Sequence, residues 1–179
     1  VAELVLGLCV MLIRKIADKN RAAHDGRWQK DAKGSYELRG KTLGIIGYGN
    51  IGSQVSIMAE AMGMQVMYFD IATKLPHGNA KQMRDLKEML KRSDIVTLHV
   101  PSDRTTRNMI NADTLKAMRK GSILINHSRG DVVDINALKK AIVNGKLSGA
   151  AIDVFPEEPE KSGDKFVTVL QNLPNVILT

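Results

Sequence analysis

The sequence predicts an α/β protein with a doubly wound parallel sheet, and two of its features lead to this prediction. First, short apolar runs alternate with segments of helical spacing through most of the chain. Strands that are continuously apolar and separated by helices are typical of a parallel sheet covered on both faces. Second, the glycine-rich turn GYGNIG at 47–52 joins the first such strand to a helix. Together these features indicate a Rossmann-type dinucleotide-binding domain.

The first segment of the chain has apolar residues at helical spacing and is predicted to form one buried helix. Its apolar run, Leu4–Ile13, is shorter than the roughly 20 residues that a membrane span requires, and no basic segment precedes it as in a signal peptide. The chain begins inside this pattern without a Met, so we expect a piece of a two- or three-domain protein. The expected division is an N-terminal helix and dimerisation arm over 1–39, packed on the same domain, and a dinucleotide-binding domain over 40–179, with the substrate domain outside this chain.

The remaining elements follow from apolar runs and their end signals. Asn111 and Asp134 can cap helices, Gly145 permits a helix to stop, and Pro101 ends a strand. The predicted strands are Leu43–Tyr48, Val66–Asp70, Ile95–Val100, Ser122–Asn126, Ala150–Val154 and Val176–Leu178. The predicted helices span about 50–62, 85–91, 111–118 and 134–144.

Composition limits the classes of function. The chain has 179 residues, 44% of them hydrophobic, which is enough for one domain with a real core. A net charge of +7 fits either a solvated basic surface or attraction of anionic small molecules. Scattered basic residues and 4% aromatics argue against nucleic acid. The single cysteine, Cys9, excludes an intrachain disulfide and fits the cytoplasm. No metal site and no membrane partner are predicted.

Each glycine of the turn has a physical task in dinucleotide binding. Gly47 permits the tight turn out of the strand, Gly49 leaves room for a pyrophosphate beside the backbone, and Gly52 lets helix and strand pack closely. The following helix offers free N–H groups and the positive end of its dipole to the phosphates. The alternative is that these glycines are ordinary turn residues.

An acidic residue at the end of the second predicted strand selects the cofactor. Asp70 lies 18 residues after Gly52, close to the spacing of the dinucleotide fingerprint. It would accept hydrogen bonds from the adenosine ribose and repel the 2′-phosphate of NADP by about 4 kcal/mol. The nearest following cation is Lys74. The sequence therefore predicts NAD, unless Asp70 is only an exposed strand end.

Ligands of open parallel sheets bind beyond the carboxyl ends of the strands, so the loops there should hold the site. Three loops are candidates: 99–101, 126–130 and 153–159. Within them, the guanidinium of Arg129 suits a bidentate grip on a carboxylate. A structural ion pair is the alternative for Arg129.

Five segments, GIIGYGNIG, LHVP, NHSRG, VVDINAL and AAIDVFPEEP, occur in this order and spacing. With them the chain resembles, over essentially its whole length, the D-isomer-specific 2-hydroxyacid dehydrogenase family. The resemblance implies an oxidoreductase that transfers a hydride between NAD and a small-molecule D-2-hydroxy acid. RGKTLGIIGYGNIGSQ, KLPHGNA and AIDVFPEEP are most similar to the microbial members that oxidise 3-phosphoglycerate to 3-phosphohydroxypyruvate in serine biosynthesis. The alternatives are another specificity (glyoxylate, hydroxypyruvate or lactate) and an NAD(H)-gated corepressor-like binding protein.

The resemblance also implies residue roles. Two catalytic roles are carried over: Arg129 would bind the substrate carboxylate and polarise the reacting oxygen, and Glu158 would orient the catalytic histidine and raise its pKa. Its neighbour Glu157 is expected to be a bystander. The implied cofactor contacts beyond Gly47, Gly49, Gly52 and Asp70 are backbone amides of Asn50 and Ile51 at the pyrophosphate, Val100 and Pro101 at the adenine, Thr106 at a phosphate, and Asp153 at the nicotinamide carboxamide.

Hydride transfer from an alcohol also needs a base, and histidine is suited to this task near neutral pH. In the family this histidine directly follows the last strand, which here lies in VILT at 176–179, so we expect it to fall just beyond Thr179. We therefore expect that the 179 residues alone bind NAD without turnover. His127 departs from the family, which has a small residue there. Its side chain either points away from the cofactor or alters nicotinamide binding.

Relatives of this kind pack the N-terminal helix and arm against a second subunit, so the resemblance implies a homodimer or higher homo-oligomer. Trp28 and Tyr36 supply large apolar side chains for such a contact. The alternative is that the helix covers only its own sheet.

Overall fold

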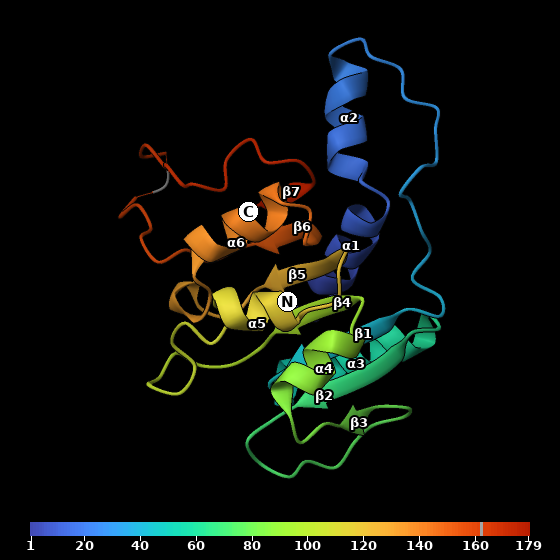
Figure 1. Cartoon of the computed structure of the whole chain (residues 1–179), viewed down its shortest axis with the longest axis vertical. Coiled ribbons are helices and arrows are strands. Elements are labelled where there is room, and N and C mark those ends of the chain that lie inside the picture. The colour runs from blue at the N-terminus through green and yellow to red at the C-terminus, as the bar shows by residue number, and fades with distance from the viewer. Residues whose placement is uncertain (162) are drawn as a thin grey trace.

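The computed structural model describes residues 1–161 and 163–179, and its centre is one parallel sheet with helices on both faces (Figure 1). The strand order is β3-β2-β1-β4-β5-β6-β7. The strands are β1 Thr42–Ile46, β2 Gln65–Phe69, β3 Lys81–Gln82, β4 Ile95–Leu98, β5 Ser122–Asn126, β6 Leu147–Ile152 and β7 Val176–Leu178. The helices are α1 Ala2–Ile13, α2 Ile16–His24, α3 Asn50–Ala61, α4 Leu86–Arg92, α5 Ala112–Ala117 and α6 Ile135–Val143, with a 3₁₀ turn at Gly130–Val132. The predicted fold class is confirmed.

Two hydrophobic layers enclose the sheet. On one face, α1 and α3 pack against strand residues such as Ile45 and Ile125. On the other face, α4, α5 and α6 pack against Ile46 and Leu98. Because neighbouring residues of a strand point to opposite faces, a strand buried on both sides must be apolar throughout. This explains why the continuous apolar runs located the central strands correctly.

Several boundaries differ from the predictions for local reasons. The predicted single N-terminal helix is wrong: Lys15 adopts a left-handed conformation (φ 55°) and separates α1 from α2, whose one buried residue is Ala22. The first strand ends at Ile46 because Gly47 turns the chain with φ +90°. The predicted strand Ala150–Val154 begins earlier, at Leu147, which pairs with β5. The edge strand β3 was missed because two residues carry no apolar pattern.

None of the helices over the described residues is long and apolar enough to cross a membrane.

A single asparagine fastens the N-terminal helices to the sheet. The side-chain amide of Asn175 donates to the carbonyls of Leu12 (3.1 Å) and Ser148 (2.9 Å), and its backbone N–H donates to Asp18 Oδ2 (2.7 Å). A Cβ on Gly149 would lie 2.4 Å from this amide, so only glycine fits beside it. We call these three hydrogen bonds the Asn175 clasp. The clasp joins α1 and α2 to β6 and β7.

We expect Asn175→Ala to lower the free energy of unfolding by about 1–3 kcal/mol, because two side-chain hydrogen bonds are lost, one to the buried Leu12 carbonyl and one to the part-buried Ser148 carbonyl. Asn172→Ala is the matched control, since Asn172 is exposed and also has a positive φ (61°, against 52° for Asn175). Urea denaturation of both variants separates the hydrogen bonds from the backbone strain. Equal losses in the two variants would contradict the clasp.

Candidate functional site

One row of residues lies just beyond the carboxyl ends of the strands. The register aligns the final strand residues Phe69, Ile46, Leu98, Asn126, Ile152 and Leu178 across the sheet. The residues that follow them therefore lie side by side at the same edge. We call this set the end row: Asp70, Gly47, His99, His127, Asp153 and Thr179. Neighbouring strands are about 4.8 Å apart, so the row from Asp70 to Asp153 extends roughly 19 Å.

The glycine turn between β1 and α3 has the geometry that its sequence predicts. A Cβ on Gly47 would lie 2.4 Å from the carbonyl oxygen of His99, and one on Gly52 would lie 2.2 Å from that of Gly47. A Cβ on Gly49 would meet nothing within 4 Å. The turn is thus closed on the protein side at Gly47 and Gly52, and open at Gly49.

The amino end of α3 begins directly after this open position. Its first helical hydrogen bond runs from Ser53 N to the Gly49 carbonyl (3.0 Å), so the N–H groups of Asn50, Ile51 and Gly52 precede the helical ladder. Such N–H groups, together with the helix dipole, favour a bound anion. Gly49 leaves the space that a pyrophosphate would need.

Asp70 follows β2 in the end row and lies beside this glycine turn. Its Oδ2 accepts from the Tyr48 N–H (2.8 Å) and its Oδ1 from the Ala72 N–H (2.9 Å). A carboxylate offers about four lone-pair sites, so each oxygen can accept one more hydrogen bond. Asp70 therefore fixes the glycine turn and can still accept from a ribose hydroxyl.

A pocket of about 490 Å³ opens between Asp70 and the loop after β4. Its walls are mainly apolar and include Val100 and Pro101, the two residues that the resemblance places at the adenine. Gly47, Gly49 and Thr106 also line it. Apolar walls with a few polar groups are typical of a small-molecule site, so the pocket fits the adenosine half of a dinucleotide.

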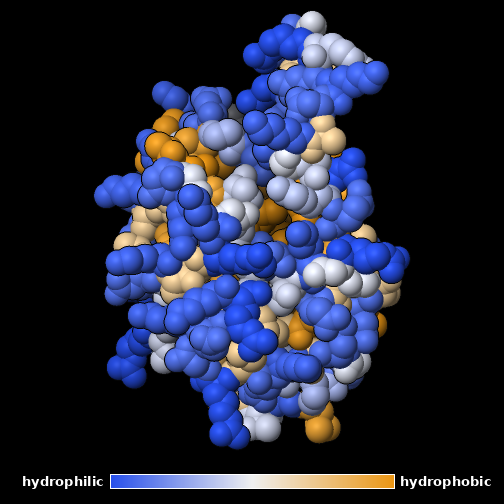
Figure 2. Space-filling model, turned by 45° about the vertical axis from the view of Figure 1, so that its right-hand side comes forward, coloured by the Kyte–Doolittle hydropathy of each residue, from blue (hydrophilic) through white to orange (hydrophobic). Residues whose placement is uncertain are grey.

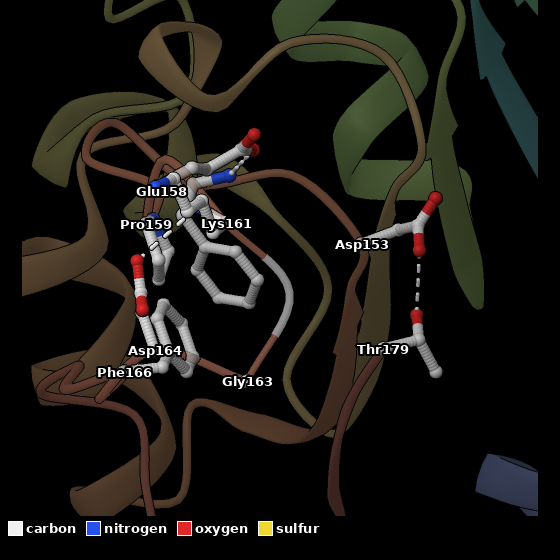
Figure 3. A pocket seen from close by; sticks show the side chains of 9 residues that line it. Asp153, Glu158, Pro159, Lys161, Gly163, Asp164, Phe166 and Thr179 are labelled. Carbon is white, nitrogen blue, oxygen red and sulfur yellow. Dashed lines mark hydrogen bonds between the residues drawn. The ribbon is translucent and has the colours of Figure 1, made fainter.

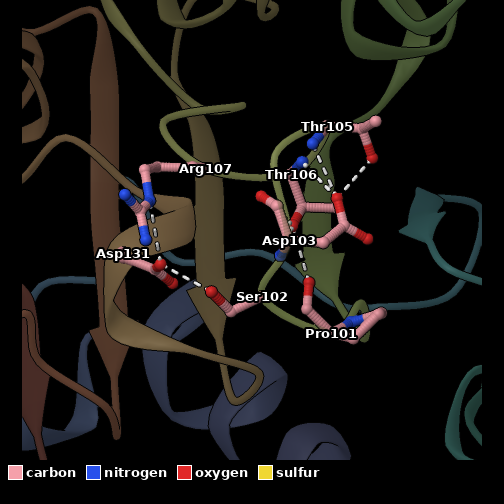
Figure 4. Close-up of polar contacts among 7 residues, drawn as sticks. All are labelled: Pro101, Ser102, Asp103, Thr105, Thr106, Arg107 and Asp131. Atoms are coloured by element: carbon pink, nitrogen blue, oxygen red, sulfur yellow. Dashed lines mark hydrogen bonds and ion pairs between the residues drawn. The ribbon is translucent and has the colours of Figure 1, made fainter.

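Thr106 belongs to a tightly bonded loop beside the pocket (Figure 4). Its hydroxyl donates to the Pro101 carbonyl (2.7 Å) and accepts from the Asp103 N–H (2.9 Å). Hydrogen bonds from Thr105 lower the pKa of Asp103. Asp131, which accepts from Ser102 Oγ (2.6 Å), joins this loop to the next. Thr106 would have to release Pro101 to donate to a phosphate, so that contact stays a prediction.

The loop that carries Arg129 is organised by a buried asparagine. Asn126 donates to the Arg129 carbonyl (3.0 Å) and accepts from both the N–H (3.0 Å) and the hydroxyl (2.8 Å) of Ser128. Arg129 itself is exposed and donates to the Ser128 carbonyl (2.7 Å). No carboxylate of the described residues lies within salt-bridge distance of Arg129. Asn126 was not predicted as a functional residue, although a polar residue at the end of an apolar strand is a usable signal.

The Arg129 loop touches the 153–159 loop without an intervening side chain. A Cβ on Gly130 would lie 2.1 Å from the carbonyl carbon and oxygen of Phe155. Glycine at 130 is therefore required for the two loops to approach this closely.

A second pocket, of about 360 Å³, lies beyond β6 and β7 (Figure 3). Asp153, Glu158 and Thr179 line it, whereas Glu157 lines a different pocket. Glu158 Oε1 accepts from the Phe155 N–H (2.8 Å), which folds the loop back on itself. Of the two adjacent glutamates, Glu158 is thus the one that shares a pocket with Asp153.

His127 points inward, toward the nicotinamide side of the predicted site. Its side chain is 1% exposed, and its Nδ1 lies 3.0 Å from Asp153 Oδ2. Burial lowers the pKa of His127 and outweighs the opposing effect of Asp153. In the same row, burial and then the nearby His127 lower the pKa of His99 to about 4. Both imidazoles are therefore neutral at neutral pH.

The low pKa of His99 should make the fold sensitive to acid. A histidine that titrates near 4 when folded and near 6.5 when unfolded stabilises the fold above pH 6.5, and this contribution is lost as the pH falls toward 4. At 1.36 kcal/mol per pKa unit the loss is about 3 kcal/mol. His99→Gln should remove this pH dependence in urea denaturation between pH 7 and pH 4.5. The control is the exposed His24→Gln; parallel profiles for wild type and His99→Gln would contradict the assignment.

Comparison with known proteins gives a consistent match. Residues 6–179 match the family model of the D-isomer specific 2-hydroxyacid dehydrogenase NAD binding domain. Over all 179 residues the chain is 54% identical to a D-3-phosphoglycerate dehydrogenase of Haemophilus influenzae and 52% identical to one of Escherichia coli, and it spans 44% of the length of each. Among solved structures, D-lactate dehydrogenase with NAD⁺ from Lactobacillus jensenii superposes with a TM-score of 0.90 at 31% identity, covering 99% of this chain and 57% of that one.

Proposed function

The chain belongs to the D-isomer specific 2-hydroxyacid dehydrogenase family, of which it forms the NAD-binding domain, and on this premise we propose that the protein carrying it oxidises 3-phosphoglycerate to 3-phosphohydroxypyruvate with NAD. The observation that carries the substrate assignment is the identity of 54% and 52% to two D-3-phosphoglycerate dehydrogenases across the whole chain. The chain spans 44% of the length of each of these relatives.

In this proposal the cofactor lies along the end row. Asp70 accepts from the adenosine ribose, and Val100 and Pro101 pack against the adenine. The pyrophosphate lies over Gly49, facing the first amides of α3. Asp153 accepts from the carboxamide of the nicotinamide. Two observations support this placement. The space at Gly49 is open, and the strand register places Asp70 and Asp153 at the same edge of the sheet.

The chemistry falls to the loops after β5 and β6. Bound NAD supplies the hydride acceptor. Arg129 grips the substrate carboxylate and stabilises negative charge on the reacting oxygen, while Glu158 holds the family's catalytic histidine and favours its protonated form. The exposed guanidinium of Arg129 and the pocket that Glu158 shares with Asp153 support these roles.

We further propose a cytoplasmic homodimer formed through the N-terminal helices and the arm. In the single chain α2 projects from the rest of the domain (Figure 1). The face of the molecule shown in Figure 2 is covered mostly by hydrophilic residues. Trp28 and Tyr36 of the arm are 83% and 58% exposed, a large apolar surface for a free monomer. Packing of both aromatic rings against a second subunit would remove this apolar surface from water.

The test is NADH oxidation by the protein carrying this chain, with 3-phosphohydroxypyruvate, hydroxypyruvate and glyoxylate in parallel. We expect kcat/KM at least tenfold higher for the phosphorylated acid. Equal or better kcat/KM for the unphosphorylated acids would agree with the family but contradict the assignment of 3-phosphoglycerate as the substrate. Tight NADH binding with no turnover of any of the three would favour the corepressor-like class instead.

A further inference from the structure

Three end-row side chains are linked by hydrogen bonds on the nicotinamide side. Thr179 Oγ1 donates to Asp153 Oδ1 (2.8 Å), and His127 Nδ1 lies 3.0 Å from Asp153 Oδ2. Each oxygen of the Asp153 carboxylate thus has one protein partner. One partner, His127, is buried, whereas Thr179 is exposed. The rigid support of the carboxylate therefore comes from His127.

His127 has no competing polar contact within the described part of the chain. Its Nε2 is buried without a hydrogen-bond partner there, so Asp153 is the polar group that fixes the ring. The neutral ring places its proton on Nδ1, because the facing carboxylate can only accept. In this tautomer Nε2 carries the free lone pair, but it is buried, so a substrate in the open cleft does not reach it. His127 is thus unsuited to be the base of the reaction.

We propose that His127 is a positioning residue for the nicotinamide end of the cofactor: it holds the Asp153 carboxylate in the orientation that accepts from the carboxamide N–H. This inference rests on the proposed function, in which Asp153 binds that carboxamide. Both oxygens keep free lone pairs for this purpose. Without His127, Oδ2 would face no donor on the buried side, and the carboxylate would be ordered only when the cofactor binds. Preorganisation of this kind increases affinity by lowering the ordering cost.

The proposal is tested with two cofactors that differ only at the contact in question. The 3-acetylpyridine analogue of NADH carries a methyl ketone in place of the carboxamide and has no N–H to donate. Calorimetry on the protein carrying this chain should show His127→Ala weakening NADH binding about three- to tenfold, with little change for the analogue. His127→Asn, whose amide can reach the position of Nδ1, should restore most of the preference for NADH. If His127→Ala only destabilised the fold, the affinities for NADH and for the analogue would fall equally.

Asp153→Ala separates failure of this inference from failure of the proposed function. If Asp153→Ala leaves the preference for NADH unchanged, Asp153 does not bind the carboxamide and the proposed cofactor placement is wrong. If Asp153→Ala abolishes the preference but His127→Ala retains it, the positioning role of His127 is wrong. If His127→Ala does not fold, His127→Asn against His127→Phe, which fills the volume without a donor, gives the same comparison.

Discussion

Replacing Arg129 by lysine should lower kcat/KM for 3-phosphohydroxypyruvate about a hundred- to thousandfold while leaving NADH affinity within about twofold. Lysine keeps the positive charge but loses the planar pair of N–H donors that matches a carboxylate. Loss of one such donor at a developing oxyanion costs about 3–4 kcal/mol, which corresponds to this range of rates. The exposed helical Arg92→Lys is the control, since it keeps the protein charge and lies far along the chain from the site.

Steady-state kinetics at saturating NADH would measure the effect. If Arg129→Lys keeps more than a tenth of the wild-type kcat/KM, the carboxylate is bound elsewhere and the assignment of Arg129 is wrong. A parallel fall in NADH affinity would instead indicate that the whole 126–130 loop has moved.

Gly52→Ala should lower the stability of the fold, whereas Gly49→Ala should weaken cofactor binding with little change in stability. The added methyl at Gly52 would lie 2.2 Å from a backbone oxygen, so we expect a loss of about 3 kcal/mol in the free energy of unfolding. At Gly49 the methyl meets open space and φ is −88°, so stability should change by less than about 1 kcal/mol. However, the same methyl occupies the space proposed for the pyrophosphate.

NADH affinity is therefore expected to fall at least tenfold in Gly49→Ala, in a protein whose urea-denaturation midpoint is nearly unchanged. Calorimetry and urea denaturation on both variants measure the two effects separately. Unchanged NADH affinity in Gly49→Ala would place the pyrophosphate away from the glycine turn.

The sequence was sufficient for the central strands because burial on both faces leaves an unbroken apolar run. It also located the caps Asn111 and Asp134, whose side chains accept the predicted backbone hydrogen bonds. These signals are local: a cap or an apolar run depends on residues within a few positions. The break at Lys15 was missed because a left-handed lysine has no sequence signature comparable to that of glycine.

The site was predictable in part. The sequence indicated which loops gather at the carboxyl edge, but not which side chains within them pair. The contact between His127 and Asp153 joins residues 26 positions apart and depends on the register of β5 with β6. Likewise, the clasp at Asn175 reaches Leu12 across almost the whole chain. Contacts of this kind follow from tertiary packing, which no pattern along one segment reports.

The direct backbone contact at Gly130 also limits which residues position 130 can accept. A Cβ there would lie 2.1 Å from the carbonyl of Phe155, so any larger residue would force the 126–130 and 153–159 loops apart. Arg129, proposed to bind the substrate carboxylate, and Glu158, proposed to orient the histidine, belong to these two loops. The separation of the two proposed catalytic groups therefore depends on glycine at a position that carries no functional side chain.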